Sequence, residues 1–94
     1  MEKDLLKIIE HFGEKFQKEY LEREYQELQN EIDKLLNGEE ENILTEITDV
    51  LVITLQFMVK ANYSFKHLEE NIKRELNFKI NRTLERIESG YYEK

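Results

Sequence analysis

The chain contains no proline and only three glycines, at positions 13, 38 and 90. Proline and glycine are the residues that most readily interrupt a helix, so a chain with so few of them can form long helices. Between the glycines, apolar residues recur at intervals of three, four and seven, which is the spacing of one face of an amphipathic helix. The sequence therefore predicts an all-α fold that is similar to a four-helix bundle.

The glycines and polar breaks predict where these helices begin and end. The expected helices cover residues 2–12, 14–36, 43–60 and 65 up to Gly90. Asn42 and Ser64 are expected to be the N-caps of the third and fourth helices, because their short polar side chains suit that position. We expect a single domain over residues 1–94, with 90–94 as a frayed tail.

Size and charge restrict the classes of partner. A chain of 94 residues buries a limited core, so we expect stabilisation by self-association into a homodimer or homotetramer. The formal net charge of −7 and the pI near 4.9 argue against long nucleic acids as partners, since phosphate neutralisation requires a basic surface. They do not argue against a phosphorylated ligand that arrives with a divalent cation.

The sequence pattern also shows neither a signal peptide nor a membrane-spanning segment. The chain has no cysteine, and residues 1–12 lack the apolar core of a signal peptide. The longest strongly apolar stretch, "VLVITLQFMV" (50–59), has about half the length that a bilayer crossing requires. We therefore expect no membrane span and a cytoplasmic location.

Acidic residues border the predicted core on two adjacent helices. Glu24, Glu27 and Glu31 are three and four residues apart on the second helix, and Glu46 and Asp49 repeat this spacing on the third. The connection between the two helices is short, so they are expected to lie antiparallel. Four or five carboxylates would then converge between them.

Carboxylates that lie close together repel one another, and a divalent cation is the simplest compensation. Oxygen ligands suit Mg²⁺ or Mn²⁺, and Mg²⁺ commonly binds a few carboxylates together with substrate phosphates. His11 and His67 do not fall at the spacing that iron or zinc sites in helix bundles use. The pattern therefore favours Mg²⁺, with Mn²⁺ as a substitute. The competing interpretation is that these acids belong to an ordinary solvated surface.

The segments "EYQELQNEI" (24–32) and "LTEITDVLV" (44–52) resemble the E-x-x-E, spacer, E-x-x-D signature of the MazG-like all-α nucleoside triphosphate pyrophosphohydrolases. The resemblance implies that the metal ligands are Glu24, Glu27, Glu46 and Asp49. Glu31 would be an auxiliary or orienting acid. One departure from the family pattern is Arg23, where many members carry a second glutamate.

The resemblance also implies an activity, which is the Mg²⁺-dependent hydrolysis of a nucleoside triphosphate between its α- and β-phosphates. Glu27 or Glu31 would orient the attacking water. In this family the nucleotide pocket is commonly completed by a second subunit, which agrees with the expected homo-oligomer.

Two further groups of residues are candidates for substrate binding. Lys79, Arg82 and Arg86 follow one another at spacings of three and four, which suits phosphate contact or, alternatively, pairing with Glu75 and other surface acids. Candidates for base binding, chosen by position, are Phe12, Gln17 and Tyr20; each is alternatively an ordinary core or surface residue.

Two other functions remain open at this point. The first is a catalytically idle helical binding or regulatory protein that retains the fold. Its motivation is the partial match of the predicted phosphate-binding residues, since Ile80 stands where longer family members carry arginine. The second is a purely structural helix bundle.

Overall fold

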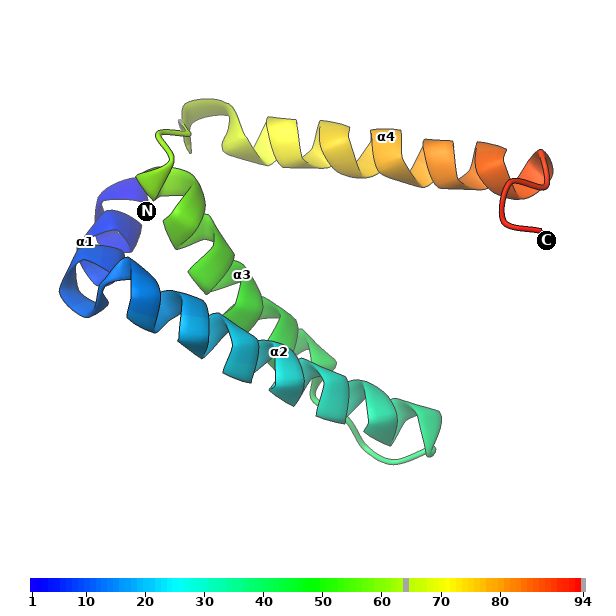
Figure 1. Ribbon diagram of the computed structural model, residues 1–94, viewed down its shortest axis with the longest axis horizontal. Helices are drawn as coiled ribbons and strands as arrows, with labels where there is room; N and C mark the ends of the chain where they lie inside the picture. Colours follow the sequence, from blue (N-terminus) through cyan, green and yellow to red (C-terminus); the bar gives the residue numbers. More distant parts are fainter. Residues whose placement is uncertain (64, 94) are drawn as a thin grey trace. The chain divides into compact units, whose positions relative to one another are not determined.

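The computed structural model describes residues 1–63 and 65–93, and the side chains of all of these except Phe65. These residues form four α-helices and one short 3-10 helix, and none of them lies in a strand. The elements are α1 (Glu2–Phe12), α2 (Glu14–Leu36), α3 (Ile43–Lys60), η1 (Phe65–His67) and α4 (Leu68–Glu88) (Figure 1). The predicted all-α architecture with four helices is confirmed. The more specific prediction of a bundle fold stays a prediction.

The chain divides into two compact units, Met1–Tyr63 and Ser64–Lys94. The first contains α1, α2 and α3, and the second contains η1 and α4. The expectation of one domain over residues 1–94 stays a prediction.

A single glycine connects α1 to α2. Gly13 has a φ of +90° and donates its N–H to the Ile9 carbonyl at 2.8 Å, while its own carbonyl accepts the Gln17 N–H at 3.1 Å. One residue therefore ends the first helix and begins the second. A side chain at this position would be strained by the positive φ, which glycine adopts without penalty.

The connection between α2 and α3 also depends on a glycine. Gly38 has a φ of +73°, and the following N–H of Glu39 returns to the Lys34 carbonyl at 2.9 Å. Asn42 occupies the predicted N-cap position of α3, although its side chain accepts from the Thr45 hydroxyl (3.0 Å) and not from a backbone N–H. The other predicted N-cap, Ser64, lies outside the described residues; His67 precedes α4.

In the first unit, α2 and α3 run antiparallel and side by side, and α1 packs against both at the end away from the turn (Figure 1). The apolar core of this unit consists of Leu5 and Ile9 from α1 and Ile53 and Val59 from α3. Each such side chain stabilises the fold by about 1.5–3 kcal/mol relative to exposure. The remaining buried residues of the unit are polar, and all of them lie on α2 or α3: Gln17, Glu24, Glu31 and Gln56.

The second unit is one amphipathic helix with its turns. The apolar residues of α4 follow the predicted spacing. Leu68 is 5% exposed, whereas the others in this spacing are 36–58% exposed: Ile72, Leu76, Ile80, Leu84 and Ile87. After α4, hydrogen-bonded turns occupy residues 90–93, in which the Tyr91 N–H donates to the Arg86 carbonyl at 2.9 Å. Lys94 lies outside the described residues. In the described ranges 1–63 and 65–93, no helix combines the length and apolar character that a membrane crossing needs.

Candidate metal and nucleotide site

Three polar pairs face each other across α2 and α3, and we call them rungs. The rungs are Gln17 with Gln56, Glu24 with Asp49, and Glu31 with Asn42. Successive rungs are seven residues apart on α2, and also from Gln56 through Asp49 to Asn42, the residue that precedes α3. Seven residues are about two helical turns, so all three rungs lie along the same contact between the antiparallel helices. The middle rung is the only one of the three in which both residues are acidic.

The two outer rungs are hydrogen bonded. Gln17 Nε2 donates to Gln56 Oε1 at 2.8 Å, and both side chains are buried. At the other end, the Asn42 backbone N–H donates to Glu31 Oε1 at 2.9 Å, and Lys34 Nζ lies 2.7 Å from Glu31 Oε2. Lys34, followed by the Asn42 N–H, lowers the pKa of Glu31 despite partial burial. Both oxygens of Glu31 therefore already have partners.

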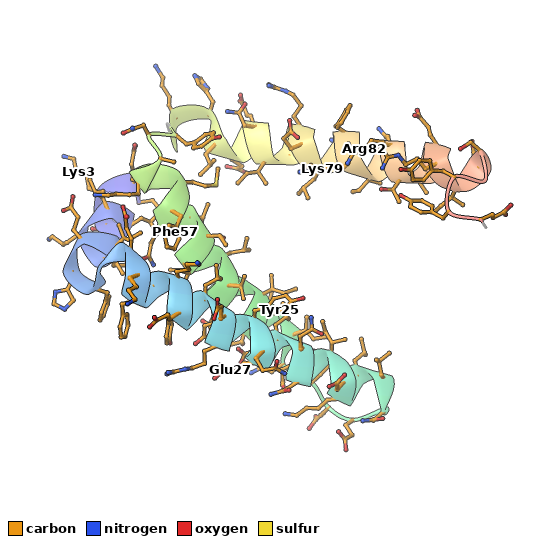
Figure 2. All side chains as sticks on the ribbon, viewed as in Figure 1. Lys3, Tyr25, Glu27, Phe57, Lys79 and Arg82 are labelled. Atoms are coloured by element: carbon orange, nitrogen blue, oxygen red, sulfur yellow. The ribbon has the colours of Figure 1, made fainter. Side chains whose placement is uncertain are left out.

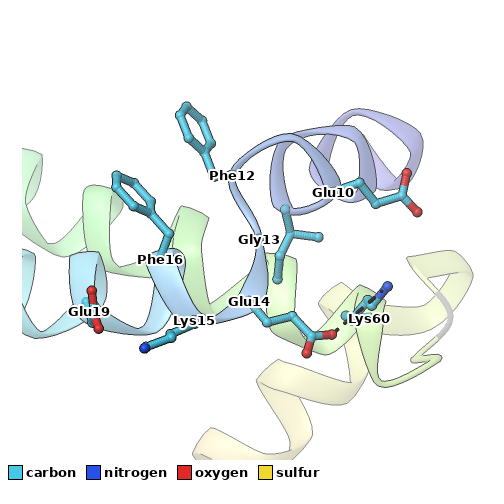
Figure 3. Close-up of a pocket in the computed structure, with 9 residues that line it drawn as sticks. Glu10, Phe12, Gly13, Glu14, Lys15, Phe16, Glu19 and Lys60 are labelled. Atoms are coloured by element: carbon cyan, nitrogen blue, oxygen red, sulfur yellow. Dashed lines mark ion pairs between the residues drawn. The ribbon is translucent and has the colours of Figure 1, made fainter.

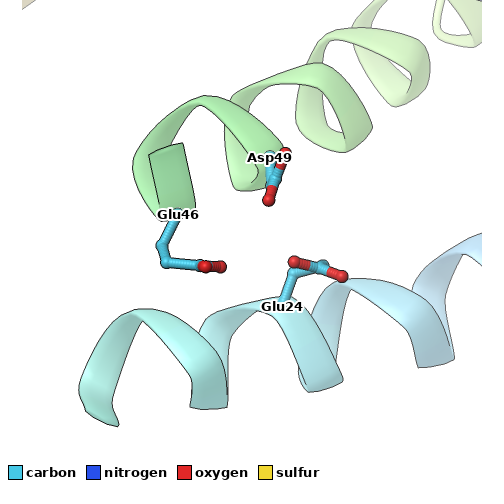
Figure 4. Close-up of side chains that lie close together, drawn as sticks. All are labelled: Glu24, Glu46 and Asp49. Atoms are coloured by element: carbon cyan, nitrogen blue, oxygen red, sulfur yellow. The ribbon is translucent and has the colours of Figure 1, made fainter. Parts of the chain in front are cut away.

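The middle rung is extended by Glu46 to form an acidic cluster of Glu24, Glu46 and Asp49 (Figure 4). One carboxylate oxygen from each residue lies within 4.8 Å of the other two. Glu24 is buried, Glu46 is half-buried and Asp49 is exposed. The cluster therefore runs from the interior of the helix pair to its surface.

Two oxygens of this cluster are buried without compensation. Glu24 Oε2 and Glu46 Oε2 have no hydrogen-bond partner within the part of the chain that the structure describes. Leaving a buried acceptor unpaired costs about 1–3 kcal/mol, and more when it is charged. A cation with a preference for oxygen ligands would compensate both.

The pKa of Glu24 reflects this environment. Burial is the largest cause that raises it, and the negative charges of Glu27 and Asp49 raise it further, while a hydrogen bond with Tyr20 acts in the opposite direction. The same hydrogen bond is the main cause that raises the pKa of the Tyr20 hydroxyl. The structure therefore holds a carboxylate where its negative charge is unfavourable in the absence of a cation.

The four predicted metal ligands are only partly brought together. Glu24, Glu46 and Asp49 share the cluster, whereas Glu27 is exposed and lies outside it. Three residues correspond to 300° around a helix, so Glu27 points about 60° away from Glu24. It is nevertheless near enough for its charge to affect the pKa of Glu24.

A pocket of about 430 Å³ lies beside the cluster, between α1, α2 and α3. Asp49 is one of its lining residues, and all three predicted base-binding residues line it too: Phe12, Gln17 and Tyr20. One wall is a series of aromatic rings. Phe12 stacks on Phe16 (centroids 5.5 Å apart, 16° between planes), and Phe16 stacks on Tyr20 (6.4 Å, 10°).

Five lining residues of this pocket are not among the site residues predicted from the sequence: Ile8, Phe16, Val52, Ile53 and Gln56. Two of them, Phe16 and Gln56, offer an aromatic ring and an amide to a ligand. Phe16 is expected to be a core residue from its helical spacing, but it is 52% exposed, between the rings of Phe12 and Tyr20. Gln56 is 1% exposed. Its signal is visible in the sequence, because it is the only amide in an otherwise apolar stretch and follows Asp49 by seven residues.

A larger hollow, of about 930 Å³, lies where α1 meets α2 (Figure 3). Its lining includes the ion pair between Lys60 Nζ and Glu14 Oε1 at 4.0 Å, and the rings of Phe12 and Phe16. It contains no member of the acidic cluster. The smaller pocket is therefore the better candidate site, because only it includes Asp49.

The predicted phosphate-binding residues all belong to α4 in the second unit; Figure 2 labels Lys79 and Arg82 on this helix. The guanidinium of Arg82 lies 5.5 Å from the centroid of Phe78, and that of Arg86 lies 4.6 Å from the centroid of Tyr91. Among the described residues, none of the three cations forms an ion pair with Glu75. Their proposed phosphate contact stays a prediction.

No protein-family model matches the chain, and it has no significant match among curated proteins or solved structures.

Proposed function

We propose that this protein is a Mg²⁺-dependent nucleoside triphosphate pyrophosphohydrolase, which cleaves between the α- and β-phosphates to give a nucleoside monophosphate and pyrophosphate. The observation that carries the proposal is the acidic cluster with its two buried, unpartnered carboxylate oxygens. The resemblance of the paired acidic motifs to the MazG-like family supports the same reaction.

The donor set of the cluster fits Mg²⁺. Glu24, Glu46 and Asp49 supply only carboxylate oxygens, and Mg²⁺ is commonly held by a few carboxylates together with substrate phosphates and water. When bound, the ion would neutralise phosphate charge and favour attack by water. Mn²⁺ would be accepted as a substitute because it prefers the same ligands.

The pocket beside Asp49 suits the base and sugar of a nucleotide. Its volume of about 430 Å³ is within the usual range for small-molecule sites. The rings of Phe12, Phe16 and Tyr20 offer flat apolar surface for stacking, and the amides of Gln17 and Gln56 offer donors and acceptors. A triphosphate would then extend from the pocket along Asp49 towards Glu24 and Glu46.

Among the acids proposed for catalysis, Glu27 is the better general base. Both oxygens of Glu31 are engaged by Lys34 and Asn42, so Glu31 is better suited to fixing the turn before α3. Glu27 is exposed one turn from Glu24, where a carboxylate oxygen would accept the proton of the attacking water. Lys79, Arg82 and Arg86 stay candidates for phosphate contact on the spacing given above.

The test is a pyrophosphate-release assay over a panel of canonical and modified NTPs and dNTPs, with and without Mg²⁺. We expect Mg²⁺-dependent pyrophosphate release from at least one substrate, and loss of at least about 100-fold in kcat for Asp49→Asn, the scale of removing a major electrostatic contribution. Asp33→Asn is the matched control, because Asp33 is an exposed aspartate of α2 outside the cluster. Turnover by Asp49→Asn at the wild-type rate, or no turnover of any substrate at high enzyme concentration, would overturn the proposal.

The alternative is a catalytically idle binding or regulatory protein, and the exposed apolar residues of α3 and α4 favour it, since such surfaces commonly mark contacts with other proteins. The same assay separates the two functions. An idle protein would bind nucleotide or Mg²⁺ in calorimetry and release no pyrophosphate.

A further inference from the structure

Four side chains of α2 form one row that leads from the pocket to the acidic cluster. They follow one another at spacings of four, three and four, which places them on one side of the helix: Phe16, Tyr20, Arg23 and Glu27. Phe16 and Tyr20 line the pocket, and Tyr20 is the last residue of α2 that does so. Arg23 comes next in the row and directly precedes Glu24, a member of the acidic cluster.

The Arg23 guanidinium contacts an aromatic ring and no carboxylate. Its central carbon lies 5.9 Å from the centroid of the Tyr20 ring, and the side chain is exposed. Glu19 and Glu27 are each four residues from Arg23, at the spacing of helical ion pairs. Neither pair forms among the residues that the structure describes. Contact with a ring, unlike an ion pair, leaves the N–H donors of a guanidinium available to a ligand.

The carboxylates around Arg23 carry more negative charge than one Mg²⁺ ion offsets. They are the three acids of the cluster and the neighbour that raises the pKa of Glu24: Glu24, Glu46, Asp49 and Glu27. A triphosphate brings further negative charge to the same place. Phosphoryl transfer in such a site requires another positive group near the phosphates, and arginine commonly supplies it.

We propose that Arg23 is a phosphate-binding residue, which the Tyr20 ring holds beside the acidic cluster. This inference rests on the proposed function, because it takes the phosphates of a nucleotide as the anion that reaches the cluster. A base in the pocket would leave its phosphates at the end of the row, where Arg23 follows Tyr20. The planar guanidinium would then donate two N–H groups to one phosphate. A glutamate, which the MazG-like pattern often has at this position, lacks such donors.

Arg23 belongs to the same unit as the acidic cluster and the pocket, whereas the candidates for phosphate contact on α4 belong to the second unit. Two lysines of the first unit already face acids. Lys34 Nζ lies 2.7 Å from Glu31 Oε2, and Lys60 Nζ lies 4.0 Å from Glu14 Oε1. With Arg23, the first unit contains a pocket for the base, oxygen ligands for the metal ion and a cation for the phosphates.

Calorimetric binding of inorganic tripolyphosphate in the presence of Mg²⁺ tests this contact independently of the base. We expect the full-length wild type to bind it and Arg23→Gln to raise its Kd by about 10–100-fold, the effect of losing hydrogen bonds to a charged group. Arg23→Lys should recover part of the affinity, because it restores the charge without the planar pair of donors. Lys18→Gln is the matched control, since Lys18 is an exposed cation of α2 outside the row and its loss changes the net charge equally.

A second measurement separates phosphate contact from a structural role. Arg23→Gln should keep the Mg²⁺-dependent rise in Tm, because Arg23 is not a ligand of the ion, and circular dichroism checks its helices; Arg23→Lys gives the answer if Arg23→Gln does not fold.

Three results would overturn the inference: no tripolyphosphate binding by the wild type, equal effects of Arg23→Gln and Lys18→Gln, or loss of the Mg²⁺-dependent rise in Arg23→Gln. If the wild type then still releases pyrophosphate from a nucleotide, the proposed function stands without this contact. Conversely, tripolyphosphate binding that depends on Arg23, without pyrophosphate release from any nucleotide, supports the contact and contradicts the proposed function.

Discussion

At the scale of single residues, Glu24 is the most unusual side chain of this protein. It is 5% exposed, one of its oxygens lacks a partner, and Glu46 and Asp49 approach it from the facing helix. Its pKa is raised above the ordinary value near 4.5, mainly by burial. A buried glutamate opposes folding when it is ionised and no cation or hydrogen-bond donor offsets its charge.

Glu24 therefore predicts a specific pH dependence of stability. A carboxyl group whose pKa is raised by folding stabilises the fold fully below its unfolded pKa, near 4.5, and that contribution is lost as the pH rises through the folded pKa. In the presence of a chelator, the free energy of unfolding of the wild type should fall relative to Glu24→Gln as the pH rises from 4.5 towards 8. Urea denaturation at several pH values measures the difference.

The control for this experiment is Glu22→Gln, which changes an exposed glutamate of the same helix. Its stability should follow the wild type at every pH. Parallel pH profiles for Glu24→Gln and the wild type would contradict the interpretation of Glu24 as an uncompensated buried acid.

At the scale of elements, the contact between α2 and α3 is organised by the three rungs. The Gln17–Gln56 rung is the simplest to test, because both amides are neutral and buried. Replacement of Gln56 by leucine leaves the Gln17 amide buried without its partner, which should destabilise the protein by about 1–3 kcal/mol. The double variant Gln17→Leu/Gln56→Leu should recover most of this loss, and chemical denaturation of the three variants measures it.

An exposed amide provides the comparison. Gln26 donates to Asn30 at 3.2 Å on the surface of α2, so Gln26→Leu should change the free energy of unfolding by less than about 0.5 kcal/mol. Equal effects of Gln26→Leu and Gln56→Leu would show that the buried rung has no special role.

The sequence predicts the ends of the helices well, but it predicts only part of how the rung residues pair between α2 and α3. Glycine positions and apolar spacing are local properties, so the ends of α1 and α2 at Gly13 and the "NG" turn follow from them directly. Which residues of α2 face which residues of α3 depends on the register of the two helices. The turn between the helices sets this register, and its conformation is not a local property of the sequence. For this reason the sequence places Glu24, Glu27 and Glu31 on one face, while the structure assigns them three different environments.

At the scale of the whole molecule, the acidic cluster joins two helices that supply most of the first unit, so a bound cation would stabilise this unit as a whole. At a Mg²⁺ concentration of about 100 times its Kd, the free energy of unfolding should rise by about 2.7 kcal/mol. For a chain of this size, each kcal/mol raises the Tm by about 4–8 °C. Thermal unfolding followed by circular dichroism, with and without Mg²⁺, measures the shift.

Two variants make this thermal experiment specific. Glu46→Gln removes one carboxylate of the cluster and should lose most of the Mg²⁺-dependent shift, whereas Asp33→Asn, which is exposed and outside the cluster, should retain it. An equal shift in both variants would mean that Mg²⁺ acts through general surface charge.

The arrangement of the rungs also bears on which ion the site would accept. The hydrogen-bonded pairs on either side of the acidic cluster fix the separation of α2 and α3 two turns away in each direction. The spacing between the three carboxylates is therefore set by the packing of the two helices and cannot adjust freely to an ion. Carboxylates held at a fixed spacing discriminate between ions by radius, since Ca²⁺ needs longer bonds and more ligands than Mg²⁺. The hydrogen-bonded outer pairs would therefore limit the size of the ion held between them.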